Sequence, residues 1–155
     1  MGRLGLRAPL VRVLLTLAVG GAMAGSVAGE FRAGSLIVKD PWSRPTPPTI
    51  SVGVVYLAIT NLGSGADRLL SVESPRARHV EVHQSRTVQG VMEMRPIDSL
   101  ECPPGATVRS EPGGVHIMLL GLDAPLVAGS EFPLTLKFRD AGALTIKVRV
   151  ESRAS

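Results

Sequence analysis

The sequence is poor in cysteine and in aromatic residues. Cys102 is the single cysteine among 155 residues, which excludes an internal disulfide framework, a zinc finger and an iron–sulfur site. Aromatic residues make up only 3% of the chain, whereas 45% of it is hydrophobic and 19% is charged. A chain of this length and composition can bury the core of one domain and is not typical of a disordered protein.

Net positive charge is also scarce once the N-terminal residues are set aside. The sequence has 17 Lys and Arg against 13 Asp and Glu, but Arg3, Arg7 and Arg12 all precede the first acidic residue, Glu30. Without residues 1–28, 14 basic residues face 13 acidic ones, a net charge of +1. Proteins that bind nucleic acids need a basic surface that neutralises phosphates. We therefore predict no nucleic-acid partner.

Residues 1–28 have the pattern of a secretory signal peptide. The arginines precede a largely apolar run, Val13–Ala28, whose end is rich in small residues, as at a signal cleavage site. Cleavage is predicted after Ala28, with a cut after Ala24 as the alternative. The run is short for a membrane anchor. We therefore expect a periplasmic domain of residues 29–155 that is not stably inserted in a membrane after signal cleavage.

The rest of the chain alternates hydrophobic and polar residues. Leu134, Leu136 and Phe138 alternate with polar residues, and a second alternating run follows a turn at Gly142. A period of two is typical of strands with one buried and one solvated face. About nine short strands and no amphipathic helix predict an all-β fold, a sandwich or small barrel with its core in residues 35–150. The other predicted strands are 35–39, 52–60, 79–84, 91–95, 107–110 and 115–120.

Histidine and methionine gather in one part of the predicted domain. Beyond residue 28 the chain has three of each, and all six lie within 40 residues. A methionine on a strand is more often core filler, and a lone histidine is more often solvated, so only the joint pattern indicates a metal site. Alternate residues of a strand share a face. The residues that share a face are His79, Glu81 and His83; Met92 and Met94; and His116 and Met118.

These side chains would select a soft metal ion. Thioether sulfur is soft and uncharged, and it prefers Cu(I) over zinc, magnesium or calcium. Methionine is not lost to disulfide formation in an oxidising compartment, and it does not titrate. A site without a thiolate holds copper only moderately tightly, which suits a carrier that must surrender its metal.

The sequence resembles the PCu(A)C family of periplasmic copper chaperones. The family pattern H-x10-M-x21-H-x-M is matched by His83, Met94, His116 and Met118, with ten, twenty-one and one residues between them. The resemblance extends over roughly residues 35–150. Segments that look like the family are 41–44, 54–56, 67–69, 90–96 and 112–114.

The resemblance implies a cupredoxin-like Greek-key β-sandwich that binds Cu(I) near its surface. It implies delivery of copper to the CuA-bearing subunit of cytochrome c oxidase, directly or through a Sco-type thiol protein, by a monomer that is not an enzyme. By position, the metal ligands are His83, Met94, His116 and Met118. Met92 and His79 fall outside the pattern and are expected as neighbours of the ligands or as alternative ligands. The chain ends at Ser155 without a His- and Met-rich tail, so a second copper site is not expected.

Three other functions remain as alternatives. A blue-copper electron-transfer protein needs a cysteine thiolate, two histidines and a weak axial methionine. Cys102 lies in a predicted turn, and no histidine follows it within a short loop. A copper-sequestering protein would use the same ligands without handing copper on, and a purely structural sandwich would use them only for packing. Zinc-protease and serine-hydrolase motifs are lacking, so no enzymatic activity is expected.

Overall fold

The structure, a computed structural model, describes residues 29–153 of the chain. All regular elements in this range are strands, so the all-β prediction is confirmed, with eleven strands in place of about nine. The predicted signal peptide lies outside the described residues. The strands are β1 (Glu30–Ala33), β2 (Leu36–Ser43), β3 (Val52–Asn61), β4 (Asp67–Glu73), β5 (Ala77–Val88), β6 (Val91–Pro96), β7 (Leu100–Cys102), β8 (Thr107–Arg109), β9 (Val115–Leu122), β10 (Glu131–Phe138) and β11 (Gly142–Val150).

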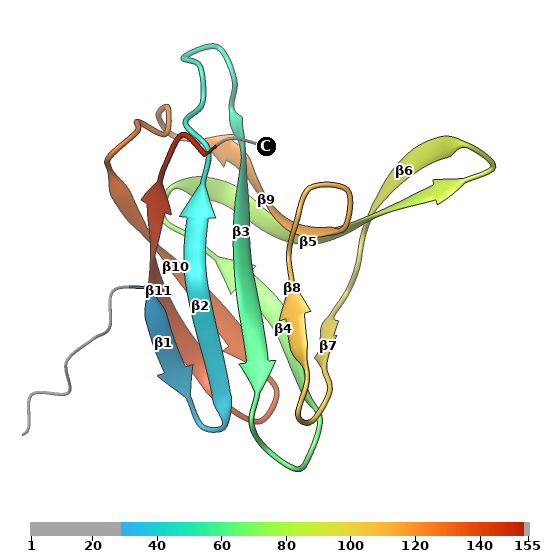
Figure 1. Cartoon of the computed structure of the whole chain (residues 1–155). Helices are drawn as coiled ribbons and strands as arrows, with labels where there is room; N and C mark the ends of the chain where they lie inside the picture. The colour runs from blue at the N-terminus through green and yellow to red at the C-terminus, as the bar shows by residue number, and fades with distance from the viewer. Residues whose placement is uncertain (1–28, 154–155) are drawn as a thin grey trace, which may run out of the picture.

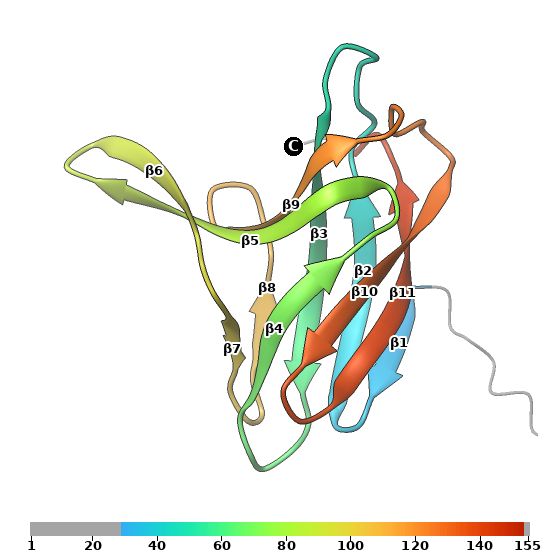
Figure 2. The same cartoon turned by 180° about the vertical axis from the view of Figure 1, so that it is seen from behind.

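The strands form one hydrogen-bonded path that folds back on itself into two facing layers (Figures 1 and 2). Its order is β6-β5-β9-β3-β2-β11-β10-β4-β7, with β1 added to β2 and β8 added to β3. Neighbouring strands are antiparallel apart from β11 and β2, which run parallel with Arg149 opposite Trp42. This arrangement confirms the predicted β-sandwich.

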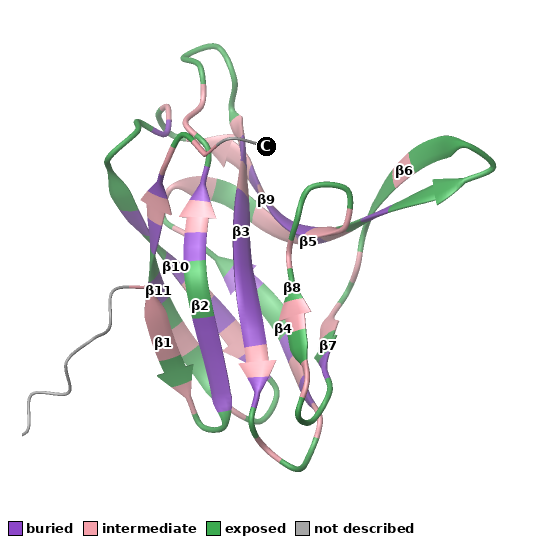
Figure 3. Ribbon diagram, in the orientation of Figure 1, coloured by how far each residue is buried: buried purple, intermediate pink, exposed green. Residues whose placement is uncertain are grey.

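The core between the layers is built by the alternation seen in the sequence. In β10, Phe132, Leu134 and Leu136 are buried, whereas the residues between them are exposed or half-buried. The central strand β3 departs from this alternation, because every residue from Val55 to Ile59 is buried in its middle (Figure 3). Each such side chain contributes about 1.5–3 kcal/mol through burial. The sandwich therefore forms a stable support for the side chains on its outer faces.

The β5–β6 hairpin extends beyond the sandwich (Figures 1 and 2). Val88 and Val91 are paired, so the loop consists of Gln89 and Gly90 alone. Both loop residues have positive φ angles, 50° and 80°. Two-residue loops with this backbone form type I′ turns, whose twist matches that of the flanking strands. The turn therefore continues the two strands outwards as a narrow ribbon, most of which is exposed (Figure 3).

Three strands were not predicted, and their sequences explain why. The register between β4 and β10 shifts beside Phe138, which pairs with Leu69, while Lys137 pairs with Ser71. This irregularity leaves Leu70 exposed and breaks the period of two. β1 and β7 have only four and three residues, too few for a pattern.

One local expectation was wrong. Cys102, expected in a turn, is the last residue of β7 and is buried. Within β2, Pro41 lies between β1, β3 and β11. The ladder between β2 and β3 is irregular between Lys39 and Trp42, where Asp40 has a φ of 49°. A bulge of this kind accommodates a proline, because proline has no N–H to give to the ladder.

Candidate metal centre

Two of the four predicted ligands lie directly opposite one another. His83 of β5 pairs with His116 of β9 in the antiparallel ladder. Their rings have centroids 5.9 Å apart and are inclined at 49°. Opposite residues of a pair project to the same face of the sheet. The structure therefore brings together two imidazoles from segments that are far apart in the sequence.

The ring of His116 is held by the backbone of the preceding loop. The side chain is 5% exposed, and its Nδ1 lies 3.1 Å from the carbonyl oxygen of Gly114. The same oxygen accepts a hydrogen bond of 3.0 Å from the N–H of Ser85 in β5. Because a carbonyl oxygen has two lone pairs, both can be used here. The orientation of His116 is thus tied to both strands of the pair.

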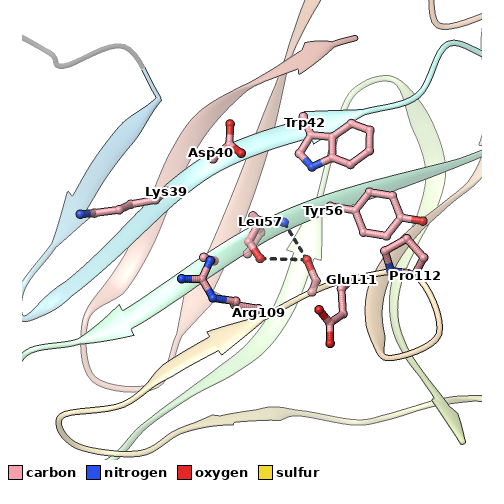
Figure 4. A pocket seen from close by; sticks show the side chains of 10 residues that line it. Lys39, Asp40, Trp42, Tyr56, Leu57, Arg109, Glu111 and Pro112 are labelled. Carbon is pink, nitrogen blue, oxygen red and sulfur yellow. Dashed lines mark hydrogen bonds between the residues drawn. The ribbon is translucent and has the colours of Figure 1, made fainter. Parts of the chain in front are cut away.

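The loop that supplies Gly114 is itself fastened to β3. The hydroxyl of Ser110 accepts a hydrogen bond of 2.7 Å from the N–H of Leu57 and donates one of 3.0 Å to its carbonyl oxygen (Figure 4). Within the loop, the N–H of Gly114 donates to the carbonyl oxygen of Glu111 over 3.0 Å. These bonds fix the loop, and with it the oxygen that orients His116.

A cavity of about 240 Å³ lies between this loop and β2 and β3 (Figure 4). Trp42 and Tyr56 form part of its wall, with ring centroids 4.9 Å apart, and Pro112 of the loop faces them. No histidine or methionine lines it. The cavity is therefore separate from the candidate metal site.

The ring of His83 is held by a carboxylate of its own strand. Its Nε2 lies 2.7 Å from Oε2 of Glu81, two residues earlier on the same face. The histidine side chain is 15% exposed and the glutamate side chain 43% exposed. The strand period places Glu81 on this face, but the sequence pattern indicated no role for it. The spacing of two residues between Glu81 and His83 could have indicated this contact, because residues i and i+2 of a strand are neighbours on one face.

The third predicted ligand, Met118, lies beside the histidine pair. It is two residues beyond His116 on β9 and pairs with Glu81 on one side and with Val54 of β3 on the other. It is half-buried, whereas Ile117 between the two is buried in the core on the opposite face. Met118 therefore shares the outer face with both histidines.

The fourth predicted ligand, Met94, lies on the projecting hairpin. It pairs with Ser85, which is two residues from His83 on β5, so it is a diagonal neighbour of that histidine on the same face. Met94 is 59% exposed, and Met92, which pairs with Thr87 further out, is 62% exposed. The two thioethers thus follow one another along the hairpin, with Met94 nearer to the histidines.

His79 is not brought to this group. It pairs with Leu120 and is exposed. It is four residues from His83 along β5, a distance of about 13 Å at the usual rise of a strand. The structure therefore does not support His79 as an alternative ligand of the same ion.

The single thiol is buried in the core, away from the outer face that carries the histidine pair. Cys102 pairs with Asp67 of β4, at the other end of the strand path from β5 and β6. Burial raises the pKa of the Cys102 thiol to about 11, so the neutral form prevails near pH 7. A buried, protonated thiol is a poor metal ligand.

The donor set of the outer face fits a soft ion better than a hard one. Among residues 29–153, no group of three or more His, Cys, Asp and Glu side chains is arranged to hold a metal. Two imidazoles bound to one metal at nitrogen–metal distances of about 2.0–2.1 Å have centroids about 5 to 6.5 Å apart. The 5.9 Å separation of His83 and His116 falls within this range. The same face carries the thioethers of Met94 and Met118, together with the carboxylate of Glu81, which is hydrogen-bonded to His83.

Solved structures have the same fold. The chain matches the copper-bound PCuAC domain from PmoF2 with a TM-score of 0.69 and 27% identity, over 80% of this chain and 98% of that one. It also matches CuI-DR1885 from Deinococcus radiodurans in fold, with a TM-score of 0.60 and 22% identity, over 84% and 85% of the two chains. Fold and outer face thus define a cupredoxin-like sandwich of the PCuAC type, as the sequence resemblance implied.

Sequence comparison gives the family. Residues 36–150 match the family described as "Putative lipoprotein LpqE-like", and the chain belongs to it. It is 36% identical to "Putative lipoprotein Lxx21020" of Leifsonia xyli over 60% of its length. It is 32% identical to "Uncharacterized protein RP573" of Rickettsia prowazekii over 71% of its length. The matches span 57% and 63% of these two relatives, less than two thirds of either.

The family description refers to a lipoprotein, a class of exported protein. The one cysteine of this sequence is Cys102, which is buried in β7. Residues 29–153 include no helix with the length and apolarity that a membrane span requires.

Proposed function

We propose that this protein is an exported Cu(I) chaperone whose ligands are His83, Met94, His116 and Met118. Its function is to deliver copper to the CuA site of cytochrome c oxidase, directly or through a Sco-type thiol protein. It acts in the periplasm after removal of residues 1–28, as a monomer and without enzymatic activity.

The observation that carries the proposal is the position of the histidine pair next to two thioethers. His83 and His116 face one another on β5 and β9, Met118 follows on β9, and Met94 is a diagonal neighbour on β6. Two neutral imidazoles and two thioethers are a soft donor set that favours Cu(I). A similar domain, the PCuAC domain from PmoF2, has been solved in a copper-bound form, which supports copper as the ion.

The exposure of the site supports transfer rather than storage. Met94 is 59% exposed on the hairpin, so one ligand can be reached from solvent while His116 remains buried. An anionic thiolate is a better donor to a soft cation than a thioether is. An acceptor with two thiols can therefore replace the exposed ligand first and draw the copper downhill.

A blue-copper function is disfavoured by the place of the thiol. Such a site needs the cysteine among its ligands, but Cys102 is 1% exposed in the core and pairs with β4. Sequestration uses the same ligands as transfer, and only the fate of the bound copper separates the two.

Two measurements test the proposal. The first is a titration of the purified protein with Cu(I) in competition with a chromogenic chelator, in which one ion per chain is expected. The second is to mix the Cu(I)-loaded protein with a reduced CuA domain or a reduced Sco-type protein, separate the two and measure copper in each. We expect copper on the acceptor. Copper that stays with this protein while the acceptor thiols are reduced and free would contradict delivery and favour sequestration.

A further inference from the structure

Each histidine of the pair uses one ring nitrogen for a hydrogen bond to a group that can only accept. His116 uses Nδ1, whose partner is the carbonyl oxygen of Gly114 at 3.1 Å. His83 uses Nε2, whose partner is the carboxylate of Glu81 at 2.7 Å. A carbonyl oxygen and an ionised carboxylate have no hydrogen to give. In both bonds the hydrogen is therefore on the histidine nitrogen.

This assignment decides which nitrogen of each ring keeps its lone pair. A neutral imidazole has one N–H and one nitrogen that can accept a hydrogen bond or bind a metal. In His116 the hydrogen is on Nδ1, which leaves Nε2 as the donor atom. In His83 the hydrogen is on Nε2, which leaves Nδ1. The two rings are thus opposite tautomers.

We propose that Cu(I) is bound by Nδ1 of His83 and Nε2 of His116, and that Glu81 is the positioning residue that selects Nδ1. The inference rests on the function proposed above and deepens it by naming the bonding atoms. A hydrogen bond from the unliganded N–H to an acceptor fixes the ring of a metal-bound histidine and makes its other nitrogen more basic. Glu81 acts through His83 and does not itself bind the ion.

The hydrogen-bond acceptor of His116 is held more firmly than that of His83. The role of Glu81 can therefore be tested by substitution. The carbonyl oxygen of Gly114 is held by the loop and also accepts the N–H of Ser85 over 3.0 Å. The side chain of Glu81 is 43% exposed. Substitution at position 81 therefore changes the hydrogen-bond acceptor of His83 at a position outside the buried core.

The first experiment is NMR of the purified protein with ¹⁵N-labelled histidines, without metal and loaded with Cu(I). In the metal-free protein we expect the Nε2–H tautomer of His83 and the Nδ1–H tautomer of His116. On loading, these two N–H groups should persist, and the large ¹⁵N shifts should fall on Nδ1 of His83 and Nε2 of His116. A copper-induced shift on Nε2 of His83, with loss of its hydrogen, would overturn the inference.

The second experiment compares three variants by Cu(I) competition and by the same NMR spectra. Glu81→Leu removes the acceptor, so His83 should populate both tautomers and Cu(I) affinity should fall about 10- to 100-fold, as for other outer partners of metal-bound histidines. Glu81→Gln keeps an oxygen that accepts from Nε2–H, so tautomer and affinity should stay near those of the unchanged protein. Glu73→Leu is the matched control, because Glu73 lies on β4 and forms an ion pair with Lys137.

The outcomes separate this inference from the proposed function. If the unchanged protein binds no Cu(I), the proposed function fails and the inference fails with it. If it binds Cu(I) but Glu81→Leu binds as tightly and keeps the Nε2–H tautomer, the function stands and only the role of Glu81 is overturned. If Glu81→Leu does not fold, the histidine tautomers measured by NMR in the unchanged protein and in Glu81→Gln test the role of Glu81 instead.

Discussion

His83 and His116 face one another across the β5–β9 pair, with ring centroids 5.9 Å apart, although β6, β7 and β8 intervene in the chain. The register of a β ladder is strongly specified when one face is buried, because a slip by one residue would expose the core side chains. Here Val82 and Ile117 form the buried side of the same pair. The packing of these two residues therefore holds the two imidazoles opposite one another.

The first prediction concerns this histidine pair. His116→Ala should lower Cu(I) affinity by more than about tenfold, since loss of a mere outer partner of a ligand already costs that much. The fold should persist, because the carbonyl oxygen of Gly114 keeps its bond from the N–H of Ser85. Chelator competition measures the affinity, and circular dichroism measures the fold. His79→Ala is the matched control and should bind normally, as His79 pairs with Leu120 away from the pair.

The second prediction separates the two methionines of the hairpin. Met94→Leu should weaken Cu(I) binding strongly, whereas Met92→Leu should have a smaller effect, because Met94 is the nearer of the two to His83 in the ladder. Their exposed fractions, 59% and 62%, are nearly equal, so loss of apolar surface affects both variants alike. Competition titrations of the two variants give the comparison. Equal and mild effects would show that Met94 is not the sole thioether ligand from this strand.

The third prediction concerns Cys102. Burial raises the pKa of its thiol to about 11, and only the thiolate reacts readily with alkylating reagents. The folded protein should therefore react slowly with iodoacetamide at pH 8, and protein unfolded in urea should react fast. Cys102→Ala should leave Cu(I) binding unchanged. Protection of the thiol by bound Cu(I), beyond that given by the fold, would place Cys102 at the metal and contradict the ligand set proposed here.

The fourth prediction concerns the pH dependence of stability. Burial alone would raise the pKa of Asp67, but the N–H groups of Asp140, Arg68 and Ala141 donate to its carboxylate and hold the pKa below its ordinary value of 3.8. A carboxyl group with a lowered pKa in the folded state stabilises the fold above its ordinary pKa. This stabilisation is lost as the pH falls through the folded-state value. The free energy of unfolding should therefore decrease below about pH 4.

Urea unfolding of Asp67→Asn tests this source of stability. The amide keeps one accepting oxygen but turns an NH₂ group toward N–H donors, so we expect a loss of about 1–3 kcal/mol at pH 7. The decrease in stability between pH 4 and pH 2 should also become smaller than in the unchanged protein. Asp98→Asn, at an exposed position, is the control and should alter neither quantity. An unchanged acid dependence in Asp67→Asn would contradict the prediction.

Much of the fold could be predicted from the sequence, because most strands have one solvated face and so show a period of two. The alternation of Leu134, Leu136 and Phe138 predicted β10 directly. β4 was missed because its register with β10 is irregular beside Phe138. Leu69 and Val72 are both buried although they are three residues apart, and Leu70 between them is exposed, so the period of two is broken. A bulge is a property of two strands together, and a single strand's sequence does not reveal it.

For the candidate site, the sequence pattern predicts a set of residues but not their arrangement. Strand parity placed His116 with Met118, and His83 with Glu81, on common faces. It did not show that β5 is the direct neighbour of β9, because strand order depends on contacts made by the whole chain. For the same reason it could not separate His79 from His83, which have the same parity but lie opposite different residues of β9.

The parallel pair of β2 and β11 has a consequence for the order of events in the life of the protein. It joins Trp42 and Ser43 to Arg149 and Val150, so the sandwich cannot close until the last strand is available. β3 pairs with β2 on one side and with β9 on the other, which links the histidine pair to that closure. Pairings between distant segments form late, because the chain entropy must be lost before the contacts compensate for it. For a chain exported unfolded, as the proposed signal peptide implies, the proposed copper site would form only after translocation, and the protein would acquire its ion in the compartment where it folds.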